Sequence, residues 1–283
     1  MEPGLDGDLL EAWARAIDAG PFSSLCFGER MAFDNPDALT LLGACAAWTE
    51  RVRLVTTVIV PQLHDPVMLA KALATADLLS KGRLSVGLGV GGRDEDYVAA
   101  GVDPALRTLA ELADRAAVMK RVWAGDRVVE ACLPVGPAPV QPGGPELLVG
   151  ALGPRSIRRA ATWADGLAGM TMDLDLAGVA AAFGQARAAW SAEGRPPPRL
   201  TTSFWFAIGD GARDQLDRHL RHYLNWLPSS IVEAMLPSCG FAGSGSELLG
   251  LLKRLEDLGA DEVCLIPTDG DVGQVHRVAD LIA

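Results

Sequence analysis

The chain has 283 residues and a formal net charge of −11; 49% of its residues are hydrophobic and 22% are charged. This balance fits a soluble globular protein, built as one large α/β barrel or as two mid-sized domains. The acidic charge argues against a nucleic-acid or anionic-membrane partner, because those surfaces attract basic patches. We therefore expect a small-molecule ligand.

The five cysteines are odd in number, widely spaced and free of CxxC or Cys/His clusters: Cys26, Cys45, Cys132, Cys239 and Cys264. Such a pattern predicts neither a disulfide framework nor a metal site. The N-terminus has no basic region followed by an apolar stretch, and no apolar run reaches the ~20 residues needed to cross a bilayer. We therefore expect a cytoplasmic protein.

In the first half of the chain, amphipathic helices alternate with continuous apolar strands. This alternation is typical of a parallel sheet covered by helices, whose strands are buried on both faces. Strands are expected over 23–27, 52–60 and 84–90. Helices are expected over 8–19, 37–48, 65–79 and 104–123. A Pro- and Gly-rich connector follows at about 135–146, and it has the composition of an excursion across a barrel mouth.

The second half of the chain continues the same pattern. Strands are expected over 147–151, 166–170, 201–208 and 262–267. Helices are expected over 155–164, 175–193, 212–227, 229–236, 247–258 and 272–282. The whole pattern predicts an α/β fold, a (β/α)₈ barrel formed by one domain over 1–283. Only Met1–Leu5 precedes the first helix, so we expect the first strand to be a short stub or missing.

Several consecutive segments carry a family resemblance: TERVRLVTTVIV from Thr49, DPVMLAKALATAD from Asp65, SKGRLSVGLGVGG from Ser80 and LVGALGPRSIRRAATWADG from Leu148. They resemble the bacterial-luciferase-like superfamily of flavin monooxygenases and coenzyme F420-dependent oxidoreductases, densely over 12–165 and loosely beyond. The resemblance implies a (β/α)₈ barrel that holds reduced FMN or F420 at its C-terminal mouth. It also implies a homodimer formed through the helices 37–48 and 65–79, and a separate flavin reductase if FMN is used.

By this resemblance, two strand ends surround the ring of the cofactor. A non-prolyl cis peptide bond is expected between Thr57 and Val58, behind the ring. Gly89 and Gly91 stand at the end of the next strand, where the lack of a Cβ lets a flat ring approach the backbone. Without the resemblance, these residues fit an ordinary buried strand and a tight bend.

The strand 147–151 leads into a third predicted part of the cofactor site. Family members bind the cofactor phosphate here, and free amides at a helix N-terminus suit an anion. The alternative is an ordinary capped helix after a turn. The predicted residues are Gly150, Ala151, Leu152, Gly153, Pro154, Arg155 and Ser156.

The strand 23–27 ends in Gly28, Glu29 and Arg30. Many relatives carry an acidic residue followed by histidine here, and in several of them the histidine assists proton transfer. Arginine stays protonated near neutral pH, but it can hold an anionic ring or a substrate carboxylate. Glu29 and Arg30 are the predicted catalytic residues, with Glu29 or solvent as the proton source.

Two functions follow from the resemblance. The first is an oxidoreductase that acts on a small organic substrate by hydride transfer or oxygen activation, in which the cofactor supplies the difficult chemistry. The stretch Gly91–Tyr97 is closer to the F420 users, whereas the missing histidine and the few lysines favour FMN. The second is a non-catalytic flavin-binding or partner subunit with a degenerate site.

Overall fold

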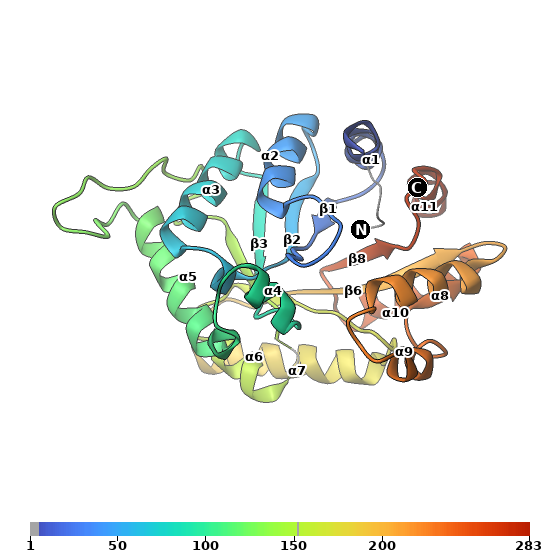
Figure 1. Ribbon diagram of the computed structural model, residues 1–283. Coiled ribbons are helices and arrows are strands. Elements are labelled where there is room, and N and C mark those ends of the chain that lie inside the picture. Colours follow the sequence, from blue (N-terminus) through green and yellow to red (C-terminus); the bar gives the residue numbers. More distant parts are fainter. Residues whose placement is uncertain (1–5, 152) are drawn as a thin grey trace.

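The computed structural model describes residues 6–151 and 153–283, so the predicted stub at 1–5 and the predicted cofactor residue Leu152 lie outside the described residues. Parallel strands alternate with helices along the chain (Figure 1). The strands are β1 (Ser24–Phe27), β2 (Arg53–Ile59), β3 (Leu84–Leu88), β4 (Glu146–Val149), β5 (Gly166–Ala168), β6 (Arg199–Ile208), β7 (Phe241–Gly243) and β8 (Glu262–Pro267).

The helices pack outside the strands (Figure 1). They are α1 (Gly7–Ala19), α2 (Ala38–Trp48), α3 (Pro66–Leu79), α4 (Asp94–Ala99), α5 (Leu109–Trp123), α6 (Pro154–Ala160), α7 (Leu176–Ala192), α8 (Ala212–Tyr223), α9 (Ser229–Met235), α10 (Gly245–Asp257) and α11 (Gly273–Ile282). Two short 3₁₀ turns, η1 (Pro61–Leu63) and η2 (Pro104–Leu106), complete the set for the described residues. In that part of the chain, no helix is long and apolar enough to span a membrane.

The strands form one parallel sheet in the order β1-β2-β3-β4-β5-β6-β7, and β8 also pairs with β6. Within the described residues, β1 pairs only with β2, and both β8 and the short β7 pair only with β6, so β1 and β8 each have one open edge. The sheet curls so that β1 and β8 face each other. The Sγ atoms of Cys26 on β1 and Cys264 on β8 lie 3.0 Å apart. The fold is therefore the predicted α/β barrel, with an unpaired seam between β1 and β8.

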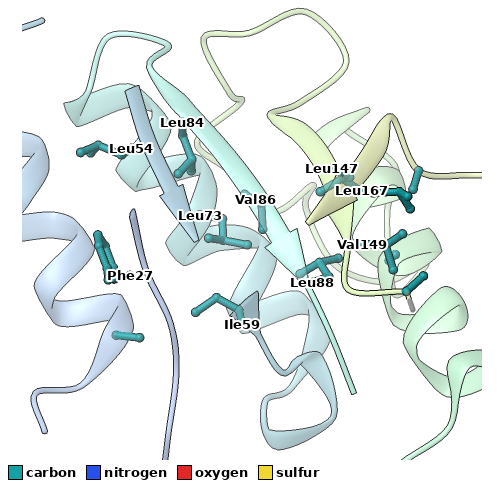
Figure 2. Packing of buried hydrophobic residues seen from close by; sticks show 14 of the residues in the cluster. Phe27, Leu54, Ile59, Leu73, Leu84, Val86, Leu88, Leu147, Val149 and Leu167 are labelled. Atoms are coloured by element: carbon teal, nitrogen blue, oxygen red, sulfur yellow. The ribbon is translucent and has the colours of Figure 1, made fainter. Parts of the chain in front are cut away.

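Alternate residues along each strand divide the core into two layers. The outer layer lies between strands and helices, and Figure 2 shows part of it, including Leu54, Leu84 and Leu147 with Leu73 of α3. The inner layer lies inside the barrel and is a smaller cluster made of Val55, Leu148 and Ala168, against which Cys26 and Val58 pack. Because neighbouring residues such as Leu54 and Val55 face opposite layers, the strands are buried on both sides, as their apolar sequences predict.

A hydrogen-bonded belt of charged and hydroxyl side chains crosses the N-terminal ends of the strands, opposite the barrel mouth. Arg199 donates to Glu262 (2.7 Å) and Glu146 (3.4 Å). Ser23 donates to the other oxygen of Glu262 (2.8 Å), and Ser85 donates to Glu146 (2.6 Å). The belt therefore links β3, β4, β6 and β8 with the residue that precedes β1, across the open seam.

One predicted helix is divided in the structure, and two short elements were not predicted. The helix expected over 104–123 is divided into η2 and α5, because the Thr108 hydroxyl accepts from the Glu111 amide and starts a new helix. The charged stretch after the glycines, for which no element was predicted, forms α4. The strand β7 has only three residues, which is too short to show the alternation of apolar and polar residues that predicts a strand, so it was not predicted.

The Pro- and Gly-rich connector does not cross the barrel mouth as predicted. Both backbone amides of Val140 and Gln141 donate to Asp77 in α3, and the Gln141 side chain donates to the carbonyl of Leu84, the first residue of β3. The segment therefore packs against the opposite end of the barrel. This follows from topology, because a connection from a helix to the next parallel strand returns to the N-terminal end of the sheet.

Candidate active site

A cavity of about 800 Å³ opens at the C-terminal ends of the strands, where (β/α)₈ barrels carry their active sites. Its wall includes residues from the ends of β1, β2, β3, β5 and β6, and it extends along the seam between β1 and β8 toward α1 and α11. Most of the lining side chains are apolar, with a few polar groups among them. This volume and lining are typical of a site for a small organic ligand or cofactor.

The structure contains the cis peptide bond predicted between Thr57 and Val58. Both residues line the cavity, at an irregular step in the pairing of β2 with β3 between Thr56 and Ile59. Two glycines pack against this step. A Cβ on Gly28 would lie 2.7 Å from the Thr57 carbonyl oxygen, and a Cβ on Gly89 would lie 2.5 Å from Cγ2 of Val58. The lack of a side chain at Gly28 and Gly89 therefore makes room for Thr57 and Val58.

Other glycines leave free space beside the cavity. A Cβ on Gly92 would meet nothing within 4 Å, and one on Gly150 would make only ordinary contacts, the nearest at 3.6 Å. Gly91 has a φ of +68°, which side chains rarely adopt, and it places the chain for the turn into α4. Since Gly89, Gly91, Gly92 and Gly150 all line the cavity, part of its wall is bare backbone.

Glu29 lies at the cavity wall with both carboxylate oxygens engaged. Its Oε1 lies 2.6 Å from Nε2 of His64, and its Oε2 accepts a hydrogen bond from the Val60 amide at 2.8 Å. The Glu29 amide donates in turn to the carbonyl of Val58. Glu29 therefore holds the chain after β2 against the end of β1. His64 also faces a second hollow, of about 430 Å³, beside η1.

Arg30 is buried with 8% of its surface exposed, and it also lines the cavity. Its Nη1 donates to the Tyr223 carbonyl at 2.8 Å, and its guanidinium carbon lies 3.7 Å from the centre of the Phe33 ring. Burial and the nearby Arg93 charge lower the pKa of Arg30 from its ordinary value. Glu29 and Arg30, the two predicted catalytic residues, thus reach one cavity together with Thr57 and Val58.

The predicted phosphate segment is only partly at the cavity. Gly150 lines it and Ala151 is buried, whereas the described residues from Gly153 to Ser156 lie outside the lining. The Ser156 hydroxyl accepts from the Gly153 amide (3.0 Å) and donates to the Gly153 carbonyl (2.7 Å). The start of α6 is thus capped by its own chain, and a phosphate site there stays a prediction.

Sequence reasoning did not predict that aromatic side chains surround Arg30. Phe33, Tyr223 and Trp205 line the same corner of the cavity, and the Tyr223 and Trp205 rings pack edge to face with centres 5.5 Å apart. Asp96 of α4 is buried, and its Oδ1 accepts from the amides of Met31 and Ala32. The acidic run before Tyr97 was a visible signal, but the carboxylate that turns inward depends on α4 being a helix.

Tyr97 is buried beside Gly91, and its hydroxyl donates a hydrogen bond to the Val90 carbonyl at 2.9 Å. Burial raises the pKa of Tyr97 to about 12, so its hydroxyl stays protonated at neutral pH. Among the described residues, no group of three or more His, Cys, Asp or Glu side chains is placed to hold a metal ion. The polar side chains that line this cavity include Glu29, Arg30, His219 and Asp269, together with a few hydroxyl and amide groups.

Proteins of similar sequence cover part of the chain. An uncharacterized protein of Mycobacterium tuberculosis is 39% identical over 151 residues, which make up 50% of this chain and 52% of that protein. An F420-dependent glucose-6-phosphate dehydrogenase of Beutenbergia cavernae is 38% identical over 95 residues, 33% of this chain and 28% of the enzyme. The chain thus spans about half the length, or less, of the curated relatives it matches.

Solved structures match nearly the whole chain. An F420-dependent secondary alcohol dehydrogenase in complex with an F420-acetone adduct superimposes with a TM-score of 0.77 at 18% identity, covering 97% of this chain and 93% of the enzyme. The oxygenating constituent of 3,6-diketocamphane monooxygenase of Pseudomonas putida, in complex with FMN, gives 0.74 at 14% identity, covering 100% and 94%. At these identities the likeness shows the fold.

The family model described as luciferase-like monooxygenase matches residues 6–262, which is most of the chain. That match agrees with the barrel fold and with a cavity at its C-terminal mouth. The chain belongs to the luciferase-like monooxygenase family, whose relatives named above use F420 or FMN.

Proposed function

We propose that this protein is an oxidoreductase that binds the tricyclic ring of F420, or of FMN, in the cavity at the barrel mouth and acts on a small organic substrate. F420 is the first candidate, because a relative of named function, 38% identical over 95 residues, is F420-dependent. Once bound, F420 would supply hydride transfer, whereas reduced FMN would also supply oxygen activation.

The observation that carries this proposal is the bare backbone on one wall of the cavity. Gly89, Gly91, Gly92 and Gly150 line it, and the space a Cβ would take at Gly92 is open. A flat aromatic ring can lie against such a wall without meeting side chains. The cavity volume of about 800 Å³ lies within the range of known cofactor and ligand sites. The residues present therefore fit the ring.

The described residues supply binding, orientation and exclusion of water. The apolar side chains of Met170, Trp205 and Ile266 line the cavity and keep water from the reacting atoms. Glu29, held by His64 and the Val60 amide, fixes the edge of the wall at the end of β1. Arg30 brings a positive charge to the same edge, where it can orient an anionic group.

Separate titrations with F420 and FMN test this function, with the fluorescence of each cofactor as the readout. We expect F420 to bind at one site per chain. A Gly150→Leu variant should weaken binding by at least about tenfold, because its side chain extends into the cavity. Gly184→Leu is the matched control: Gly184 lies on α7, and a Cβ there meets nothing within 4 Å.

Each outcome of the titrations is informative. FMN binding without F420 binding would assign the protein to the flavin users. Failure of both cofactors to bind the folded protein would contradict the proposal and favour the non-catalytic alternative. Equal effects of Gly150→Leu and Gly184→Leu would place the cofactor elsewhere.

A further inference from the structure

The corner of the cavity at the end of β1 holds a buried positive charge with only uncharged hydrogen-bond partners. Arg30 donates through Nη1 to the Tyr223 carbonyl at 2.8 Å and through Nη2 to Oδ1 of Asn225 at 3.4 Å. Its guanidinium packs on the Phe33 ring at 3.7 Å and near the Tyr223 ring at 5.0 Å. These contacts orient the guanidinium group and leave its charge uncompensated.

The carboxylates nearest to this corner already have partners. Asp96 accepts from Nε of Arg93 at 2.8 Å and from two backbone amides. Glu29 is paired with His64. Glu95, whose charge also acts on Arg30, is exposed to solvent. The corner thus holds the guanidinium groups of Arg30 and Arg93, while the buried carboxylates of Asp96 and Glu29 are engaged with Arg93 and His64, and Arg30 forms no ion pair in the described residues.

Two polar atoms of this corner have no hydrogen-bond partner. Nε of Arg30 and Oδ1 of Asn35 are buried and unpaired, and both residues line the cavity. An unpaired buried polar atom costs free energy, so such atoms concentrate where a ligand completes them. An uncompensated buried charge costs still more, because its desolvation is not offset by a counter-charge.

We propose that Arg30 is the anion-binding group of this site and that it takes the carboxylate of the substrate, a small organic acid with an apolar body. The planar guanidinium donates to a carboxylate with two parallel hydrogen bonds, which a hydrophobic wall strengthens by excluding water. Met170 and Trp205 line the same cavity and would hold the apolar body. The inference rests on the proposed function, since it assigns a substrate class to that site.

The test compares carboxylates with their neutral amides on the cofactor-free protein. Benzoate and phenylacetate are titrated beside benzamide and phenylacetamide by calorimetry, at millimolar concentrations. We expect the wild type to prefer the carboxylates. Arg30→Met should weaken carboxylate binding by about tenfold or more and change amide binding by less than about twofold. Arg30→Lys keeps the positive charge but lacks the planar guanidinium that donates two parallel hydrogen bonds. Its carboxylate affinity should lie between those of the wild type and Arg30→Met.

Arg221→Met is the matched control. Arg221 lies on α8 near the same corner, is paired with Glu233 on the surface, and its substitution makes the same change in net charge. We expect it to bind the carboxylates as the wild type does. Circular dichroism and thermal melting of each variant show that it is folded, and Arg30→Lys serves if Arg30→Met does not fold.

The outcomes separate this inference from the proposed function. No preference of the wild type for carboxylates over amides, or equal losses in Arg30→Met and Arg221→Met, would overturn the role of Arg30. If Arg30→Met lost F420 or FMN affinity and kept its carboxylate preference, the charge would serve the cofactor, which also overturns the inference. Carboxylate binding by a protein that binds neither cofactor would support Arg30 and contradict the proposed function.

Discussion

Gly89 shows how closely the site is packed at the scale of one residue. A methyl group there would lie 2.5 Å from Cγ2 of Val58, whose position is fixed by the irregular step in β2. Because valine has few alternative rotamers, the strand must shift to relieve the overlap. We expect Gly89→Ala to lower the free energy of unfolding by about 1–3 kcal/mol, as overpacked sites do, measured by urea denaturation.

The control for this prediction is Gly92→Ala, three residues further along the chain at the same cavity wall. A Cβ at Gly92 meets nothing within 4 Å, so its effect on the free energy of unfolding should stay within about 0.5 kcal/mol. Equal destabilisation by the two substitutions would show that the contact with Val58 is not the cause.

The sequence identified some of the residues at the cavity wall but not their partners. Glu29 and Arg30 could be predicted because they follow the end of an apolar strand, and Thr57 and Val58 because they lie in a strand segment that resembles the family. The Tyr223 carbonyl, which accepts from Arg30, is 193 residues away in the chain. A contact over that separation depends on the closure of the barrel, which no local pattern encodes.

At the scale of elements, Asp18 joins α1 to the turn that leads into β2. Its carboxylate accepts hydrogen bonds from the amides of Glu50 (2.9 Å), Arg51 (2.9 Å) and Val52 (2.8 Å). Burial raises the pKa of Asp18, but these amides and the Arg51 charge outweigh it, so the pKa lies below its ordinary value. The ionised carboxylate therefore stabilises the folded chain.

We expect Asp18→Asn to lower the free energy of unfolding at pH 7 by about 1–3 kcal/mol, because an amide group cannot accept all three hydrogen bonds. The folded pKa is below the unfolded value, so the stabilisation is complete above about pH 4 and is lost as the pH falls through the folded pKa. Urea unfolding at a series of pH values should show the two proteins converging in acid.

Asp114→Asn is the control for the pH series, since Asp114 is exposed on α5. Its substitution should shift the unfolding curve little at any pH. A difference between Asp18→Asn and wild type that stayed constant down to pH 2, well below the ordinary pKa of aspartate, would contradict the role of the ionised carboxylate.

Elements with a strong local signal could be predicted, and those without one could not. The strand 52–60 is β-branched and apolar, and the helix after it begins at Pro66 with Asp65 accepting from the amides of Val67 and Met68, as capped helices do. The short strand β7 and the helix α4 depend instead on their neighbours, β6 and the chain around Arg30. Tertiary contacts decided both.

At the scale of the whole molecule, the barrel has an open seam between β1 and β8 within the described residues, and side chains hold it. The Sγ atoms of Cys26 and Cys264 meet inside the barrel, and Ser23 reaches Glu262 at its base. Arg199 completes the base. Burial lowers the pKa of Arg199, but the nearby charges of Glu146 and Glu262 outweigh this effect and raise the pKa above its ordinary value. Closure therefore depends on partly buried charges as well as on backbone pairing.

Arg199 forms ion pairs with both Glu146 and Glu262, so its loss leaves both carboxylates without a counter-charge from this residue. We expect Arg199→Met to lower the free energy of unfolding by about 2–4 kcal/mol, less than for a fully buried pair because 28% of the side chain is exposed. Urea denaturation measures it, and adding Glu146→Gln and Glu262→Gln should restore part of the loss by removing the unpaired charges. Arg213→Met, which breaks a surface pair with Asp217, should cost under about 1 kcal/mol. If the two arginine variants lost the same stability, the belt would not be what closes the barrel at its base.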